Sequence, residues 1–147
     1  MSGTKPLKFA IVDVRTEQFA TFGAEVPPDQ PMQVDAGIQF RAAPNDPAVA
    51  VVLTIQFLQD EQPRIKLDVL CAFAIEREDF ERCRNDQQVV YPRDFMIHLV
   101  MLTIGTARGI LHARLEQTPY ARTILPPLDA RKMVAEDVVF DLPASDA

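Results

Sequence analysis

The chain has 147 residues, of which 48% are hydrophobic and 24% are charged, and its formal net charge is −6. This size and composition are typical of one soluble globular domain with a sizeable core, so we predict a single domain over residues 1–147. The excess of acidic residues argues against a nucleic acid or an anionic membrane as partner. It is compatible with a basic or mixed polypeptide as partner, and it could also serve only to keep the protein soluble.

The N-terminal residues, Met1 to Lys5, lack the apolar core of a signal peptide, which predicts a cytoplasmic protein. A first strand is predicted at about residues 7–15, where the apolar residues change from one face to the other between Ile11 and Val12. Either a bulge reverses the alternation at this point, or both faces of the strand are partly covered.

The link over residues 16–31 contains three prolines together with the apolar residues Phe19, Phe22 and Val26. It is too long and too rich in proline for a tight turn, so we expect a loop that lies across apolar surface. The alternative is an ordinary connection whose aromatic side chains plug the edge of the core.

Three further strands are predicted from strict alternation of apolar and other residues over residues 32–41, 49–59 and 65–75. A period of two is typical of strands that have one buried face and one wet face. The links between them are short and carry Pro44, Asn45, Pro47, Asp60 and Pro63. Such turn residues predict antiparallel hairpins, because parallel strands need longer crossovers.

The two cysteines have different surroundings. Cys71 lies in an apolar run and is expected to be a small buried hydrophobe, whereas Cys83 stands in the charged segment 76–90 and is expected to be exposed. Neither the cysteines nor the two histidines have the spacing of a zinc site, so we expect no metal site and no cofactor.

A long helix is predicted over residues 91–115. Pro92 fits its first turn, Asp94 complements the positive end of its dipole, and after Asp94 no charged residue appears until Arg108. The apolar stripe is too wide for one contact, so we expect the sheet on one side and a second copy on the other. The residues assigned to that oligomer interface are Ile97, Val100, Met101 and Ile104. A membrane span is not expected, since the apolar run is short and His98 interrupts it.

A distinctive pattern follows the helix. Arg108-Gly109 lies toward the end of the helix, and the next loop closes on Ile124-Leu125-Pro126-Pro127-Leu128-Asp129. In order and spacing, residues 91–129 resemble the protein-export chaperone SecB and its wider family. Asp129 can cap a short helix that runs through Met133. The acidic tail over residues 135–147 is predicted to be partly disordered. Within this tail, Val138-Val139-Phe140 could form a further short strand. The predicted fold class is therefore α+β, a four-stranded antiparallel sheet with a long helix on one face and a short C-terminal helix.

The resemblance implies a cytosolic holdase that binds unfolded or pre-secretory polypeptides without catalysis. It also implies a homotetramer, built as a dimer of dimers with the long helices between the dimers. The tail is unlike the polar tail through which the exporters contact the SecA motor. The sequence therefore fits equally well a SecB-like relative that serves other clients, such as the chaperones of toxin–antitoxin modules. A binder dedicated to one partner is therefore an alternative to a general holdase.

The predicted client-binding groove consists of apolar residues from the first link and from the last helix: Phe19, Phe22, Val26, Leu128, Met133 and Val134. Flexible methionine suits contact with many sequences, although these residues could also simply complete the core. An enzyme of the thioesterase kind would instead need a carboxylate or histidine on the helix to activate water, and the candidates are Asp94, His98 and His112.

Overall fold

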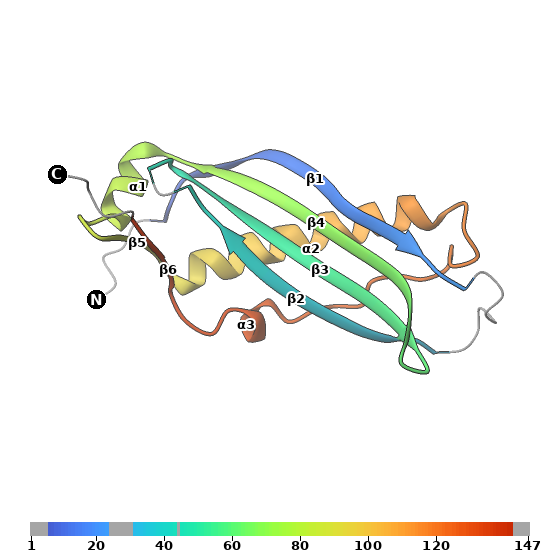
Figure 1. The fold of residues 1–147 in the computed structure, drawn as a ribbon. Coiled ribbons are helices and arrows are strands. Elements are labelled where there is room, and N and C mark those ends of the chain that lie inside the picture. The colour runs from blue at the N-terminus through green and yellow to red at the C-terminus, as the bar shows by residue number, and fades with distance from the viewer. Residues whose placement is uncertain (1–5, 24–30, 44, 143–147) are drawn as a thin grey trace.

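The computed structural model describes residues 6–23, 31–43 and 45–142. Four antiparallel strands form a sheet in the order β1-β4-β3-β2, and the long helix lies against one of its faces (Figure 1). The predicted α+β class and the predicted antiparallel strands are therefore confirmed. The strands have these bounds: β1 (Phe9–Thr21), β2 (Gln33–Arg41), β3 (Ala48–Gln59) and β4 (Gln62–Ile75).

The first strand is longer than its alternation predicts. Its pairing with β4 shifts register between Ile11 and Asp13 and again between Thr16 and Gln18. Each shift inserts a residue and resets which face the following side chains occupy, which confirms the bulge alternative. Pairing with β4 continues after the second shift, so β1 extends to Thr21, and Phe19 lies in a strand and not in the loop where we had placed it.

The turn between β3 and β4 is tight. Gln59 pairs with Gln62, so the turn consists of Asp60 and Glu61, whose φ angles are 51° and 64°. Both values lie in the left-handed region that two-residue hairpin turns require. Pro63, expected in the turn, lies instead at the start of β4, where the register shifts.

The long helix is α2 (Arg93–Leu115), which packs on β3 and β4. Pro92 occupies the N-cap position, directly before the first turn that we had predicted for it. With 23 residues and a mean hydropathy of 1.4 over its most apolar window, α2 is long and apolar enough to span a membrane, so our argument from its length was wrong. Core helices of soluble proteins meet the same criterion, and α2 buries its apolar face on the sheet of its own chain.

The core lies between α2 and the inner faces of β3 and β4. Leu53, Leu67, Phe73, Leu99 and Leu111 are all completely buried there. Side chains of this size each contribute about 1.5–3 kcal/mol when they leave water, so this contact holds the domain together.

Around the N-terminus of α2 lie elements that the periodicity of the sequence does not predict. The helix α1 (Arg77–Cys83) and the strand β5 (Gln88–Tyr91) precede α2. Near the C-terminus, α3 (Ala130–Met133) is capped by Asp129, as predicted, and β6 (Val138–Asp141) pairs with β5. The predicted short strand in the tail is therefore present, and residues 143–147, for which we predicted disorder, lie outside the described residues.

Candidate functional site

Two arginines of α2 hold the chain that follows the helix. Arg108 donates from Nε to the carbonyl of Leu125 (3.0 Å) and from a terminal nitrogen to that of Pro126 (3.2 Å). Arg93 donates from Nε to the carbonyl of Val134 (2.7 Å). The returning segment therefore runs beside α2 from one arginine to the other, which gives a physical reason for the arginine of the Arg108-Gly109 pair.

The first apolar cluster, the α3 cluster, surrounds the short C-terminal helix. Leu128 and Met133 are half-buried and pack against the core, while Val134 is only 2% exposed. Val134 therefore completes the core, and Leu128 and Met133 are the members that still present apolar surface to solvent. Arg93 also donates to the carbonyl of Arg131 (2.8 Å), which holds α3 near the N-terminal end of α2.

The second apolar cluster, the β1-end cluster, lies where β1 ends. Phe19 is half-buried, with the guanidinium of Arg114 above its ring at 5.7 Å, and Phe22 is 43% exposed. The hydroxyl of Tyr120 donates to the carbonyls of Phe22 and Gly23. Tyr120 itself is buried, so it anchors this exposed phenylalanine to the C-terminal end of α2.

Among the described residues, the two clusters of the predicted groove lie apart along α2. One adjoins Arg93 and the other Arg114, and these positions lie about 30 Å apart on a helix that rises 1.5 Å per residue. Figure 1 shows α3 and the end of β1 near opposite ends of α2. Val26, the remaining residue of the prediction, lies outside the described residues. The separation depends on tertiary contacts, so no local sequence signal could have revealed it.

The residues assigned to the oligomer interface are divided by the fold. Ile97, Val100 and Ile104 are at most 5% exposed because the sheet of the same chain covers them, whereas Met101 is 58% exposed. The solvent-facing side of α2, which we call the α2 stripe, is made of small, apolar and polar residues: Asp94, His98, Met101, Gly105, Gly109 and His112. A Cβ atom at Gly105 or Gly109 would meet nothing within 4 Å, so the fold of one chain does not require glycine at either position.

The residues considered for catalysis lie along this stripe, with Asp94 and His98 one helical turn apart and His112 far from both. The ring of His98 contacts that of Phe9 edge to face, with centroids 5.7 Å apart. His112 lies 3.6 Å from Glu116, one turn further along the helix. His98 and His112 are thus separated by about 20 Å along the axis. Within the described residues no cluster of His, Cys, Asp and Glu could hold a metal ion.

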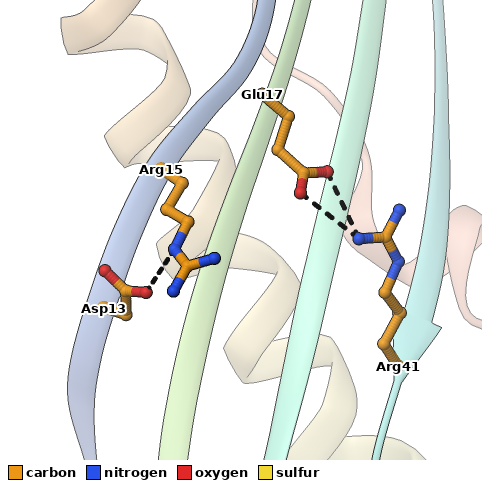
Figure 2. Close-up of polar contacts among 4 residues, drawn as sticks. All are labelled: Asp13, Arg15, Glu17 and Arg41. Carbon is orange, nitrogen blue, oxygen red and sulfur yellow. Dashed lines mark hydrogen bonds and ion pairs between the residues drawn. The ribbon is translucent and has the colours of Figure 1, made fainter.

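The face of the sheet opposite α2 carries charged side chains. Figure 2 shows Glu17 of β1 and Arg41 of β2, which approach to 3.3 Å across the sheet, and Arg15 bonded to Asp13 at 2.6 Å. Exposed pairs of this kind contribute at most about 1 kcal/mol each. These two acidic and two basic side chains balance one another in charge.

A cavity of about 350 Å³ lies beside α1, and its lining includes Leu7, Arg82, Cys83 and Arg84. Cys83 is half-buried and not exposed as expected, and burial raises the pKa of its thiol. Arg82 pairs with Asp79, and Arg84 lies 3.3 Å from Glu81, so each arginine has an acidic partner. The cavity therefore lacks the excess positive charge and the reactive thiolate that would indicate anion binding or thiol chemistry.

Comparison with known proteins shows the kind of fold. No family model matches the sequence, and no curated protein matches it. Among solved structures, the chain is similar to the Mycobacterium tuberculosis Rv1957 SecB-like chaperone, solved in complex with a ChAD peptide from the Rv1956 HigA1 antitoxin. The TM-score is 0.54 at 11% sequence identity, over 82% of this chain and 89% of the other. The likeness therefore shows that the fold is SecB-like.

Proposed function

We propose that this protein is a holdase-type molecular chaperone, which binds unfolded polypeptides through apolar surface and performs no catalysis. The observation that carries the proposal is the pair of apolar clusters at opposite ends of α2, on a SecB-like fold. A separation of about 30 Å corresponds to roughly nine residues of an extended chain. One unfolded segment could therefore reach from Phe22 to Met133.

The affinity expected from such a surface is modest for each cluster. Burying one apolar side chain of a client contributes about 1.5–3 kcal/mol, and ordering the flexible client offsets part of it. Two linked clusters act together, since the second contact becomes intramolecular and raises apparent affinity by roughly 10²–10⁴. Weak and separate contacts also tolerate many sequences, which is the property that a holdase needs.

We further propose that the chain forms a homotetramer through the α2 stripe, with Met101 and not Val100 at the contact. An interior glycine costs a helix about 1 kcal/mol relative to alanine. Close approach of a second helix would explain why Gly105 and Gly109 stand on the open side of α2. More chains in one particle would also bring more apolar clusters to one client.

The oligomer is tested by light scattering on Met101→Glu and on the control Gln117→Glu, an exposed position beyond the end of α2. We expect the first substitution to lower the mass in solution, because it places a charge at the contact, and the control to leave the mass unchanged. An equal mass for all three proteins would place the interface elsewhere.

The holdase activity is tested with the double variant Phe22→Ser, Met133→Ser, which removes one apolar side chain from each cluster. Suppression of aggregation of several chemically unfolded proteins should fall at least tenfold. The control is Val12→Ser, because Val12 is 60% exposed on β1 and belongs to neither cluster. Unchanged suppression by a folded double variant would show that clients bind elsewhere.

A chaperone dedicated to one partner is the second candidate. It is favoured by the SecB-like fold shared with Rv1957, which was solved with an antitoxin peptide. A dedicated chaperone should protect one protein made in the same cell and fail on unrelated unfolded proteins. The same aggregation assay, run on a panel of clients, separates the two functions.

A further inference from the structure

A two-stranded sheet closes the end of the molecule next to the N-terminus of α2. β6, near the C-terminus, pairs antiparallel with β5, from Gln88 opposite Asp141 to Tyr91 opposite Val138. The ladder is extended by the amide of Leu142, which donates to the carbonyl of Gln87 (2.8 Å). The C-terminal segment thus lies on β5 as an added strand.

The paired surfaces are apolar on one side. Val138 and Phe140 are half-buried, and the ring of Phe140 lies edge-on to Tyr91 with centroids 6.0 Å apart. Tyr91 is 1% exposed, whereas Val139, between the two buried side chains, is 49% exposed. The site on β5 therefore accepts a short extended segment with an aliphatic residue and an aromatic residue two positions apart.

β5 also has contacts on the side that faces away from β6. Arg84 forms a bridge with Val89, which makes a small hairpin. At its turn, Asn85 Oδ1 accepts from the amides of Gln87 (2.7 Å) and Gln88 (2.9 Å). Tyr91 then leads through Pro92 into α2, so β5 is fixed at both ends. Its edge toward β6 is a row of backbone donors and acceptors, which β6 satisfies in this structure.

The attachment of β6 is slight by comparison. It pairs over four residues, and the stretch before it, Ala135–Asp137, is exposed. Its other fixed point is Asp137, whose Oδ1 accepts from the amide of Arg93 (2.8 Å) at the start of α2. Pro92 at the N-cap offers no side-chain acceptor, so the carboxylate of Asp137 takes that role from a distant part of the chain. β6 is therefore held by a four-residue ladder, by the Asp137 contact and by the packing of Val138 and Phe140 against the core.

We propose that the edge of β5 with Tyr91 is a strand-binding site for extended segments of unfolded polypeptides, and that β6 is its occupant within the same chain. The occupant shows the chemistry of the ligand, since an extended apolar-x-aromatic segment adds a strand and places its ring on Tyr91. In the free protein β6 shields this edge, and a client segment of the same pattern competes with it. The site adds a third contact to the proposed holdase function.

The test uses the full chain and a fluorescein-labelled peptide of its own residues 137–142, Asp-Val-Val-Phe-Asp-Leu. Phe140→Ser weakens the internal strand, so we expect this variant to bind the peptide at least tenfold more tightly than the unaltered chain, by fluorescence anisotropy. The matched variant Val139→Ser changes the neighbouring exposed side chain and should bind as the unaltered chain does. A peptide with serine in place of its phenylalanine should not bind.

Equal affinity of Phe140→Ser and the unaltered chain would overturn the proposal. Hydrogen exchange is measured alongside: the amides of β5 should lose protection in Phe140→Ser and regain it with peptide. Asp137→Ala, which frees the tail from α2, provides a second variant with an expected gain of several-fold. If the unaltered chain instead forms dimers that the peptide dissociates, the edge of β5 binds a second copy of this chain. Our proposal that it binds client segments would then be wrong.

These outcomes are independent of the aggregation assay, because peptide binding at β5 uses neither Phe22 nor Met133. Loss of the holdase proposal would leave the strand-binding result intact, and the reverse also holds.

Discussion

Arg108 offers the clearest test of how the returning segment is held. Replacing it by methionine keeps most of the aliphatic stem and removes the two hydrogen bonds to the carbonyls of Leu125 and Pro126, of 3.0 and 3.2 Å. A bond from a charged donor contributes about 1.5–3 kcal/mol. The bond to Pro126 is exposed and counts for less, so we expect a loss of about 2–3 kcal/mol in the free energy of unfolding. For a chain near 150 residues this corresponds to a fall in Tm of about 5–10 °C.

The assay is thermal unfolding followed by circular dichroism, with urea unfolding to obtain the free energy. Arg108→Lys should lose about half as much, because an ammonium group cannot reproduce the planar two-pronged contact. Arg122→Met, at an exposed arginine beyond Tyr120, is the matched control and should leave Tm within about 1 °C. A fall of less than about 2 °C for Arg108→Met, equal to that of the control, would refute our account of the motif.

Two further predictions concern the core and pH. Leu99→Ala, at a completely buried position of α2, should lower the free energy of unfolding by about 2–5 kcal/mol in urea titrations, and a smaller loss would mean that the helix is not sealed against the sheet. The Arg82 guanidinium and the amide of Lys8 hold the pKa of Asp79 below its ordinary 3.8. The ionised Asp79 carboxylate therefore stabilises the fold above about pH 4, and this stabilisation is lost as the pH falls through the lowered pKa. Asp79→Asn should therefore be less stable than the unaltered chain at pH 7, with a difference that shrinks below pH 4; a difference independent of pH would contradict this.

Alternation in the sequence was sufficient to find the central strands. β3 and β4 bury every second residue, and the predicted faces, such as Leu53 and Leu67 inward, are those of the structure. Alternation reports a local property, the side of the strand that meets water, and needs no knowledge of the partner. The cap at Asp129 was equally accessible, because its side chain accepts from the amide of Arg131, two residues away.

The same reasoning failed where a residue depends on distant parts of the chain. Val100 and Met101 both belong to the apolar run of α2, yet one is completely buried and the other 58% exposed. The helical period alone does not say how much of a wide stripe one sheet covers. Phe19 was misplaced for a related reason, since only pairing with β4 shows that the strand continues beyond the second bulge.

The sequence alone determined which residues form the core, the order of the main elements and the residues at which they begin and end. Hydrophobic periodicity and turn preferences depend only on residues that are close in the sequence. Tertiary structure decided which apolar residues remained for function. Phe22 and Met133 are each local features, but their separation along α2 follows from where the returning chain is pinned by Arg108 and Arg93. Likewise, the strand at β5 exists because residues some fifty positions later in the chain lie beside it, and such contacts are set by the packing of the whole domain.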